Sequence, residues 1–402
     1  VSSTASNTQR GDRRLGSAAL NGRQQQRGEF GSSLKVISGK VVAGAAVLTA
    51  GLALAEARRQ RRVSRSRQLS AVCMHDAMPG GAATTTTTSS IPLLAGVGEL
   101  TGKYKYFTLD QYGVMHDGRN AYAGAAECLE KMNAAGCKAV ILSNYAGRSA
   151  TQRQRLYGIG LEPAHLLGVV TSGELAYQHL AKNTDQLGRK VLWISWADRD
   201  NRGLGDFFDG LDRYDLATSV EEADFILASG VESMFAGTEN EVQTTFEKDG
   251  DVTPFLEVLR VAAARKLLMI CSNPDVRVRR PGGWLAYLTG ALALEYEKLG
   301  GPVMNIGKPY GAVFQEAHRM LAEAAADAGE ADLPGESICH VGDSLHHDIA
   351  GATEAGMHSA FVMQPGVHAE ALGDKAGADD VLRLCQEEGT PSPNAILPRF
   401  VW

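Results

Sequence analysis

The sequence predicts an α/β protein with a parallel β-sheet and a second, smaller α/β domain inserted into it. Short apolar, β-prone runs alternate with segments of helical period between about residues 100 and 363. Several of these runs end in a polar or charged residue, as expected where buried parallel strands deliver side chains to their carboxyl-end edge. At 402 residues, the chain is also long enough for more than one domain.

Charge is distributed unevenly along the chain. Residues 1–75 hold thirteen basic residues against three acidic ones, a net charge of +10, whereas the whole chain carries −6, so the remainder sums to −16. An acidic body without a run of basic residues would repel a phosphate backbone, so nucleic acid is not expected as a partner. The six cysteines show neither C-x-x-C nor zinc spacing, which indicates reduced thiols.

Residues 1–92 are interpreted as an organelle-targeting leader and linker. Residues 1–40 are poor in large apolar side chains and are predicted to be disordered. The apolar run 41–55 is shorter than the roughly 20 residues that span a bilayer, so no stable membrane span is expected. A leader rich in Arg and Ser and poor in acids favours a plastid (chloroplast) transit peptide, with the mitochondrion as second choice. A membrane tether or secretion are further alternatives.

The first part of the core is predicted over residues 93–184. It opens with an apolar strand that begins near Tyr104 and ends in Asp110, a carboxylate at a Gly-containing break. By itself, Asp110 could equally cap a turn. The segments that follow are predicted as helix 119–135, strand 137–144, helix 149–157, strand 169–172 and helix 172–182.

Ser143 and Asn144 stand at the end of the second predicted strand. A hydroxyl there can donate a hydrogen bond to a phosphate oxygen. The pair can also cap the next helix, and both roles are compatible because helix N-termini bind anions.

A second α/β pattern is predicted over residues 185–284 as an inserted cap domain. It contains the predicted strands 190–195, 223–228 and 266–271 and the helix 254–265. We interpret Trp193 and Trp196 as core residues and residues 198–202 as a solvated loop. Asp275, in the segment Ser-Asn-Pro-Asp, is expected to shape the turn from cap to core.

The core pattern is predicted to resume over residues 285–402. Lys308 lies in a Gly-Lys-Pro segment, and an apolar strand, 337–342, ends in Asp343, with Asp348 five residues further on. The remaining elements are predicted as helix 285–299, helix 311–328, helix 348–356, strand 357–363 and helix 378–387.

Together, these strand ends carry the groups that phosphoryl transfer through a carboxylate needs. One Asp can attack phosphorus. Carboxylates on two different strands can hold Mg²⁺, which prefers hard oxygen ligands. A Lys and a hydroxyl can neutralise and orient the phosphate oxygens.

With these motifs in order, the chain resembles the haloacid dehalogenase (HAD) superfamily. The motifs are Leu109-Asp-Gln-Tyr-Gly-Val114, Ile141-Leu-Ser-Asn144, Gly307-Lys-Pro309 and Val341-Gly-Asp-Ser-Leu-His-His-Asp-Ile-Ala-Gly-Ala352. The segment before Asp275 and the place of the insertion are similar to subfamily IIA, and in particular to an uncharacterised group with an aromatic residue two positions after the nucleophile. The resemblance implies a Rossmannoid core with a phosphatase-like α/β cap.

The resemblance also implies roles for individual residues. The catalytic residues would be Asp110 as nucleophile, Tyr112 and Lys308. Ser143, Asn144 and Lys308 would bind phosphate, and Asp110, Tyr112 (through its carbonyl), Asp343 and Asp348 would hold Mg²⁺. The expected activity is Mg²⁺-dependent hydrolysis of a small phosphorylated metabolite through an aspartyl-phosphate. A homodimer is allowed, although the sequence carries no feature that requires one.

Tyr112 departs from the family's phosphatase pattern, in which a second Asp at this position acts as general acid and base. A phenol with an ordinary pKa of about 10 is poorly suited to the base half of this cycle near neutral pH. Asp117 and His116 are candidate substitutes, although each could instead serve only the turn. His346 and His347 are alternatives for a metal role.

Two other functions therefore stay open. One is a non-catalytic or very slow HAD-fold protein that binds a phosphometabolite. The other is a dehalogenase-type hydrolase, since haloacid dehalogenases carry Tyr at the position of Tyr112 and need no metal. The retained Asp343 and Asp348 argue against the dehalogenase.

Overall fold

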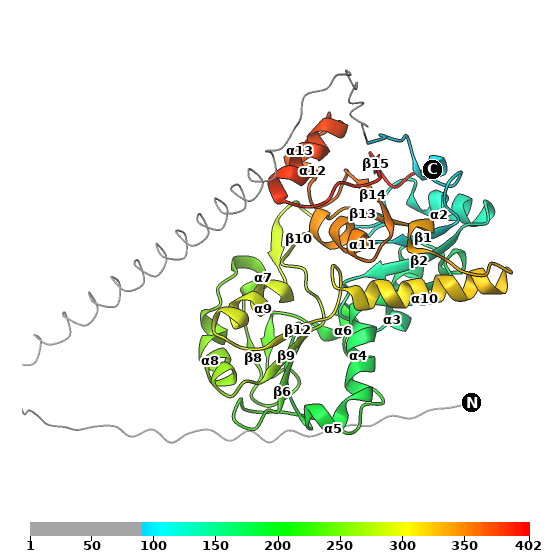
Figure 1. Cartoon of the computed structure of the whole chain (residues 1–402). Helices are drawn as coiled ribbons and strands as arrows, with labels where there is room; N and C mark the ends of the chain where they lie inside the picture. Colours follow the sequence, from blue (N-terminus) through cyan, green and yellow to red (C-terminus); the bar gives the residue numbers. More distant parts are fainter. Residues whose placement is uncertain (1–90) are drawn as a thin grey trace, which may run out of the picture. The chain divides into compact units, whose positions relative to one another are not determined.

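The computed structural model describes residues 91–402. The predicted leader, apart from its last two residues, lies outside this range. The described chain contains two main β-sheets, the core sheet, near the C-terminus in Figure 1, and the cap sheet below it, whose strands are inserted between β3 and β13 of the core sheet. The α/β class is confirmed.

The core sheet has six strands in the order β15-β14-β13-β1-β2-β3, and every neighbouring pair is parallel. β1 therefore lies between β13 and β2, with Leu109 opposite both Val341 and Ile141. The strands are β1 (Tyr106–Leu109), β2 (Lys138–Ser143), β3 (Gly168–Thr171), β13 (Ile338–Gly342), β14 (His358–Val362) and β15 (Ala395–Leu397). Every residue of β1 and β13 is buried, which explains why both read as apolar runs without polar alternation.

Alternate residues of the core strands pack into two separate apolar layers. Phe107 and Leu109 of β1 pack with Leu129 of α2, whereas Tyr106 packs on the other side with Phe314 of α10. The helices of this part are α2 (Ala125–Ala134), α3 (Ser149–Gly158), α4 (Ser172–Lys182), α10 (Gly311–Asp327), α11 (Ala350–Glu354), α12 (Ala369–Leu372) and α13 (Ala378–Glu388). A core covered on both faces leaves the strand ends as the place for polar groups.

The cap sheet has the order β12-β9-β6-β4-β7-β8, with β5 also paired to β4. Its strands are β4 (Lys190–Ser195), β5 (Asp215–Leu216), β6 (Phe225–Ala228), β7 (Ser233–Met234), β8 (Val242–Gln243), β9 (Leu268–Cys271) and β12 (Val303–Asn305). Its helices are α5 (Thr184–Leu187), α6 (Arg199–Arg202), α7 (Phe246–Asp249), α8 (Leu256–Ala264) and α9 (Thr289–Lys298). Trp193 and Trp196 are buried in its apolar core, as predicted.

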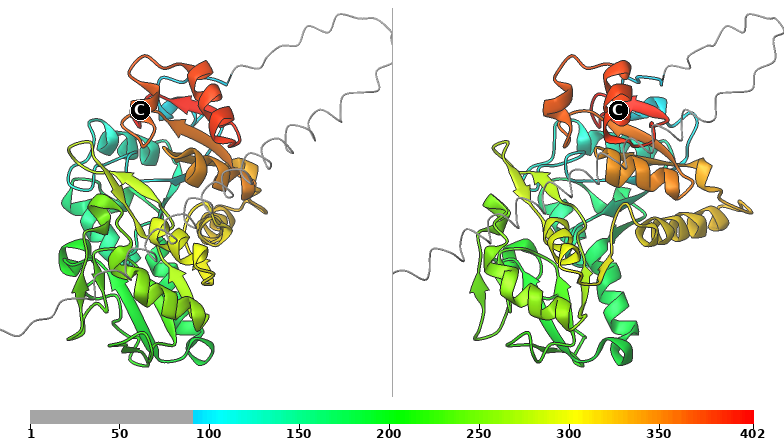
Figure 2. Two further views of the ribbon diagram at one scale, coloured as in Figure 1. Left: turned by 90° about the vertical axis from the view of Figure 1, so that its left-hand side faces the viewer. Right: turned by 60° about the vertical axis from the view of Figure 1, so that its left-hand side comes forward.

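A two-stranded antiparallel hairpin was not expected from the sequence. It joins β10 (Arg277–Arg279) to β11 (Leu285–Tyr287) and rises from the cap toward the core in Figure 2. Residues 285–287, predicted as the start of a helix, instead form its second strand, and helix α9 begins only at Thr289. The hairpin matters for the site because Arg279 contacts the core.

The predicted return to the core at residue 285 is too early. β12 pairs in parallel with β9 of the cap sheet, and α9 buries Leu292 and Tyr296 in the cap's apolar core. The cap sheet therefore extends to Asn305. A short strand cannot be assigned to one of two sheets by its sequence, because the choice depends on which neighbour supplies its hydrogen bonds.

Smaller differences from the prediction lie at element ends. The helix expected from residue 119 starts at Ala125, after Gly124, whose φ of 85° is left-handed and ends the preceding turn. The apolar tail contributes β15, the last strand of the core sheet.

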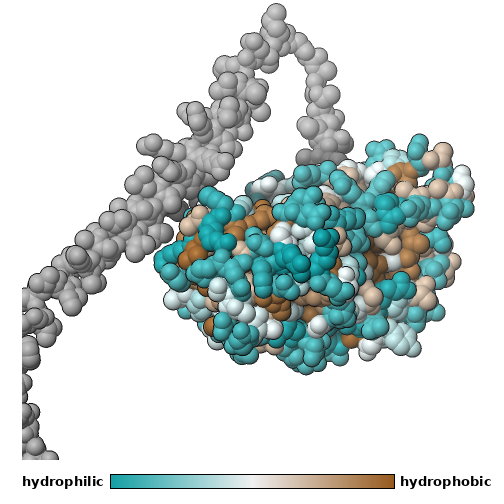
Figure 3. Space-filling model, turned by 90° about the horizontal axis from the view of Figure 1, so that it is seen from below, coloured by the Kyte–Doolittle hydropathy of each residue, from teal (hydrophilic) through white to brown (hydrophobic). Residues whose placement is uncertain are grey.

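Within residues 91–402, no helix is long and apolar enough to cross a membrane. Seen from below in Figure 3, the surface is mostly hydrophilic, with hydrophobic residues in scattered patches on that face.

Candidate active site

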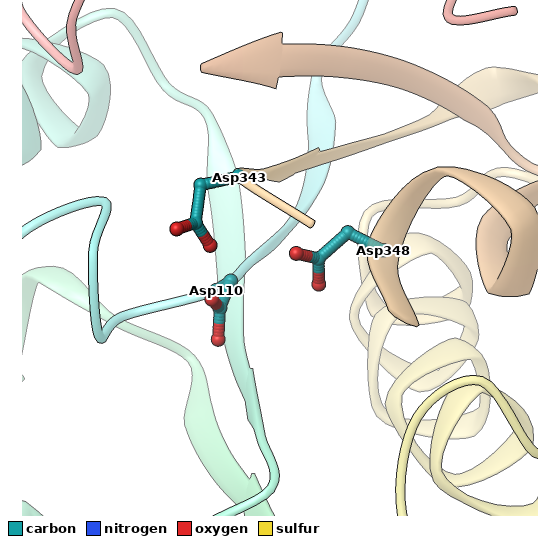
Figure 4. A group of neighbouring side chains, drawn as sticks. All are labelled: Asp110, Asp343 and Asp348. Atoms are coloured by element: carbon teal, nitrogen blue, oxygen red, sulfur yellow. The ribbon is translucent and has the colours of Figure 1, made fainter. Parts of the chain in front are cut away.

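Three carboxylates converge at the carboxyl-end edge of the core sheet. Asp110 follows β1, Asp343 follows β13, and Asp348 lies on the single π-helical turn η5 (Leu345–Ile349) that follows. One carboxylate oxygen of each lies within 4.8 Å of one from both others, and all three side chains are buried. Figure 4 shows them pointing toward one another. The parallel order β13-β1-β2 brings them together because neighbouring parallel strands end at the same edge.

Lys308 neutralises part of this cluster. The residue lies between β12 and α10, and its Nζ is 2.7 Å from Asp110 Oδ1 and 2.6 Å from Asp348 Oδ1. Lys308 is itself buried, so burial would lower its pKa, but the ion pairs with Asp110 and Asp348 outweigh burial and raise the pKa. The ammonium is therefore charged at neutral pH and fixed beside Asp110.

The three carboxylates differ in how well they are compensated. Burial raises the pKa of Asp110 to about 7, with Lys308 opposing and Asp348 adding to the rise. Burial and the charges of Asp110 and Asp348 raise the pKa of Asp343 well above its ordinary value. Burial also opposes ionisation of Asp348, yet Lys308 and His340 hold its pKa below the ordinary range. Two carboxyl groups are thus destabilised as anions in the absence of a cation.

Asp348 is held in place by a chain of buried polar groups. His340 Nε2 lies 2.9 Å from Asp348 Oδ1, and His340 Nδ1 lies 2.8 Å from the hydroxyl of Thr108 on the neighbouring strand β1. The backbone N–H of Ser344 donates to Asp348 Oδ2 at 2.9 Å. These contacts fix the Asp348 carboxylate, which in turn orients Lys308 beside Asp110.

Asp343 has a different environment. Its Oδ2 accepts a hydrogen bond of 2.6 Å from the backbone N–H of Val367. Gly113 and Gly366 approach so closely that a Cβ on either would lie 2.4 Å and 2.5 Å, respectively, from atoms of the Asp343 side chain. Gly113 also has a φ of 86°. The absence of a side chain at both glycines therefore leaves the space that the Asp343 side chain occupies.

Ser143 is arranged as a hydrogen-bond donor. Its Oγ accepts from Gln111 Nε2 at 2.6 Å and from the backbone N–H of Tyr145 at 3.1 Å. Gln111 is held in turn by Gln152, which donates to its Oε1 at 2.7 Å. Because a serine hydroxyl accepts two hydrogen bonds and donates one, its proton remains to be donated into the cavity that Ser143 lines.

The side chain of Asn144 positions Lys308. Its Nδ2 donates to Asp275 Oδ1 at 2.8 Å and to the carbonyl of Lys308 at 3.0 Å, and its Oδ1 accepts from the backbone N–H of Lys308 at 2.6 Å. Both N–H groups of the amide are therefore engaged, so the side chain has no donor left for the predicted contact with phosphate. Asp275 links cap and core at this turn, as predicted.

The side chain of Tyr112 joins the core to the cap hairpin. Its phenol donates a 2.8 Å hydrogen bond to the carbonyl of Arg279 on β10, and its ring lies edge-on to His116. Burial raises the pKa of Tyr112, with Arg280 opposing the rise. The phenolic proton is thus committed to the cap hairpin. The carbonyl oxygen of Tyr112 accepts no hydrogen bond from the described residues, which leaves it available as a metal ligand.

The two predicted substitutes for the missing acid–base are engaged elsewhere. Asp117 Oδ1 accepts from the backbone N–H groups of Arg119 and Asn120, the arrangement of a turn cap. His116 is buried, its Nδ1 accepts from Gly118 N–H, and burial lowers its pKa to about 4. Of the two loop histidines, His346 lies 3.4 Å from Glu388 Oε2 and His347 lies 3.4 Å from Asp275 Oδ1. None of the four belongs to the carboxylate cluster.

The site opens into a cavity of about 1510 Å³ that is lined by both core and cap residues. The core wall includes Asp110, Asp343 and Ser143, and the cap wall includes Arg202 and Arg280. The cavity can accommodate a substrate considerably larger than a phosphate ion.

Models of known families match both parts of this core. A model described as haloacid dehalogenase-like hydrolase matches residues 107–201, and a second, described as HAD-hydrolase-like, matches residues 305–384. Over these two segments, the chain is a haloacid dehalogenase-like hydrolase. The predicted resemblance to this superfamily is confirmed, and with it the assignment as a hydrolase. A search of curated proteins returned no match.

Solved structures share the architecture of this HAD hydrolase. A haloacid dehalogenase-like hydrolase from Brucella suis 1330 is 26% identical, with a TM-score of 0.60 over 77% of this chain and 100% of its own. A possible sugar phosphatase from Cytophaga hutchinsonii is 21% identical, with a TM-score of 0.57 over 77% and 99%. A p-nitrophenyl phosphatase from Archaeoglobus fulgidus is 20% identical, with a TM-score of 0.51 over 74% and 97%. The last two similarities establish the fold alone.

Several residues of the site were not predicted. Thr108 and His340 face each other in register on β1 and β13, and Gln111 and Gln152 orient Ser143. A polar residue inside an otherwise apolar strand is a usable signal, because a buried polar group needs a partner. The carbonyl of Arg279 and the N–H of Val367 offered no such signal, since backbone groups are present at every residue.

Proposed function

We propose that this chain hydrolyses small phosphomonoesters through an aspartyl-phosphate formed on Asp110. The observation that carries the proposal is the buried carboxylate cluster with Lys308 Nζ 2.7 Å from Asp110. Such a cluster has no evident structural purpose, because burying three carboxylates against one ammonium is costly.

The residues act in two steps. In the first, a carboxylate oxygen of Asp110 attacks phosphorus, the bond from phosphorus to the ester oxygen breaks, and the leaving alcohol takes up a proton. In the second, water attacks the phosphorus of the aspartyl-phosphate, which releases phosphate and restores the carboxylate. Lys308 and the hydroxyl of Ser143 donate to the phosphate oxygens in both steps.

The donor set fits a divalent cation of the Mg²⁺ type. Asp110, Asp343 and the carbonyl of Tyr112 offer hard oxygen ligands, and two of these groups are carboxyls whose pKa burial raises. Asp348 already has three partners, in Lys308, His340 and Ser344, and would support the site without binding the ion directly. When bound, the ion would neutralise charge on the phosphate and stabilise the ionised carboxylates.

Tyr112 should make turnover slow. Loss of a general acid–base commonly reduces rates about 10²–10⁴-fold, and the phenol of Tyr112 is held by Arg279. Protons must then pass to and from solvent water in the cavity.

The test is hydrolysis of p-nitrophenyl phosphate with Mg²⁺, with EDTA, and by Asp110→Asn, each with protein lacking residues 1–90. We expect release of p-nitrophenol that EDTA abolishes and that Asp110→Asn reduces to below about a thousandth. Asp185→Asn is a matched control, since Asp185 is an exposed cap carboxylate.

Two other results would replace the proposal. Mg²⁺-dependent binding of phosphate esters without turnover, even after long incubation, would indicate a binding protein. Release of halide from haloacids that EDTA does not affect would indicate a dehalogenase that uses Asp110 on carbon.

We also propose import into plastids, supported by the basic, acid-poor composition of residues 1–75. Fusion of residues 1–90 to a fluorescent reporter should direct it to the organelle, whereas a diffuse cytosolic signal would refute import.

A further inference from the structure

Two arginines on the cap wall share one buried carboxylate. Arg202, the last residue of α6, donates from Nη2 to both oxygens of Glu247 at 3.2 Å. Arg280 donates from Nε and Nη2 to Oε1 of the same residue, at 3.0 and 2.6 Å. The guanidinium of Arg202 also lies 4.3 Å from the centroid of the Trp196 ring. These contacts hold both guanidinium groups in place before any ligand arrives.

Both side chains keep donors for a further partner. Among the described residues, Arg202 makes side-chain hydrogen bonds through Nη2 alone, and Arg280 through Nε and Nη2. Both side chains line the cavity and are 31% and 19% exposed, respectively. Nε and Nη1 of Arg202 and Nη1 of Arg280 can therefore donate to a ligand in the cavity.

The local charge is positive. Two guanidinium groups face the single carboxylate of Glu247. The second nearby acid, Glu232, offsets less, because burial and the charge of Glu247 raise its pKa. The interpretation of residues 198–202 as a solvated loop is therefore wrong for Arg202, which is part of the cavity wall.

The pair lies in the same cavity as the carboxylate cluster. Arg280 directly follows Arg279, whose carbonyl accepts the hydrogen bond from Tyr112, two residues after Asp110. The hairpin that carries Arg280 rises from the cap toward the core (Figure 2). A ligand whose phosphate lies at Asp110 can thus extend along the cavity to this wall.

We propose that Arg202 and Arg280 bind a second anionic group of the substrate, a carboxylate or phosphate separate from the one that is hydrolysed. The inference rests on the proposed phosphatase function, which places the hydrolysed phosphate at Asp110. Guanidinium groups match the oxygens of both anions in geometry and charge. The face of Trp196 is covered by Arg202, so the indole supports this guanidinium. The substrate class is therefore a phosphomonoester with at least one further negative group.

Two pairs of compounds test the proposal. Each pair differs only in the second anion: phenyl phosphate against 4-carboxyphenyl phosphate, and 3-hydroxypropyl phosphate against propane-1,3-diyl bisphosphate. Kd is measured by calorimetry with Asp110→Asn protein and Mg²⁺, and kcat/KM of the unmodified protein is measured by phosphate release. We expect the bis-anion to bind at least about tenfold more tightly in one pair or both, and the pair that responds identifies the anion.

Variants connect the preference to the two arginines. Arg202→Gln and Arg280→Gln, each made in the Asp110→Asn protein, should each reduce the preference for the bis-anion about tenfold and change Kd of the mono-anion less than twofold. Arg213→Gln, which removes an exposed cap charge that pairs with Asp185, should leave both values unchanged. Thermal unfolding identifies a variant that is misfolded, and the other variant then decides.

The outcomes separate this inference from the proposed function. Equal Kd values within both pairs, or a preference that survives both substitutions, would overturn it even if phosphate is released. A preference that the substitutions remove would support it even if no compound is hydrolysed, in which case the proposed phosphatase activity alone fails.

Discussion

At the scale of single residues, Tyr112 separates two properties that one acidic residue would combine. Its backbone carbonyl remains available for a cation, whereas its side chain joins core to cap through the carbonyl of Arg279. Burial raises its pKa, so the phenol stays protonated and cannot accept a proton from water near neutral pH. The residue therefore joins core to cap and, in the proposed mechanism, supplies no base for the second step.

Two substitutions at this position distinguish these properties. Tyr112→Asp should raise the rate of p-nitrophenyl phosphate hydrolysis at least about tenfold, because it restores an acid–base beside Asp110. Tyr112→Phe should leave kcat within about threefold, because the phenolic proton takes no part in the chemistry, while the lost hydrogen bond costs about 1–3 kcal/mol. If Tyr112→Phe abolishes turnover, the phenol is a catalytic group, and the proposed division of roles is wrong.

At the scale of elements, β13 and the turn η5 form one unit that delivers two of the three carboxylates. η5 folds back so closely on the end of β13 that a Cβ at Gly342 would lie 2.2 Å from Cγ of Asp348. This approach places Asp348 beside Lys308 and His340. A strand that ends in Gly-Asp thus positions its own Asp343 and makes room for the second carboxylate.

Gly342→Ala tests this packing. The added methyl group should displace Asp348, reduce turnover at least about tenfold and lower the free energy of unfolding by about 1–3 kcal/mol, the usual cost of overpacking. Gly102→Ala is a suitable control, because no atom lies within 4 Å of a Cβ at that position. Turnover is measured by phosphate release and stability by urea denaturation. Equal behaviour of both variants would contradict the proposed contact.

At the scale of the folded part of the chain, the carboxylate cluster couples stability to pH and to cations. The pKa of Asp110 is raised to about 7, so between about pH 4 and 7 the folded state binds more protons than the unfolded state. Without a cation, stability should therefore fall as pH rises through this window, and Asp343 contributes with the same sign. Asp348 has a lowered pKa, so its contribution is lost only below about pH 4.

Thermal unfolding at several pH values, with Mg²⁺ or with EDTA, measures this coupling. The increase in Tm caused by Mg²⁺ should grow from pH 5 to pH 7.5. At a hundredfold excess of Mg²⁺ over Kd, the free energy of unfolding should rise by about 2–3 kcal/mol. Asp343→Asn should raise Tm in EDTA at pH 7 and remove the response to Mg²⁺, whereas Asp185→Asn should do neither. A Mg²⁺ effect that is independent of pH would show that the cation does not compete with these protons.

The sequence by itself predicted five of the six strands of the core sheet, all but β15, and the residues at their ends. Buried parallel strands need continuous apolar runs, and their order along the chain places Asp110, Ser143 and Asp343 at one edge whatever the loops do. The motifs around these residues were sufficient to identify the family. The same motifs also showed that Tyr112 departs from the phosphatase pattern of the family.

Only the tertiary structure decided what Tyr112 and the cap do. The hydrogen bond from Tyr112 to Arg279 joins residues 167 positions apart, and the bond from Thr108 to His340 joins residues 232 positions apart. Arg202 and Arg280 read as ordinary surface charges until the fold brings them to one carboxylate. Local sequence patterns describe a residue's neighbours along the chain, whereas hydrogen bonds and ion pairs depend on distances in space, which only the packing of the folded chain determines.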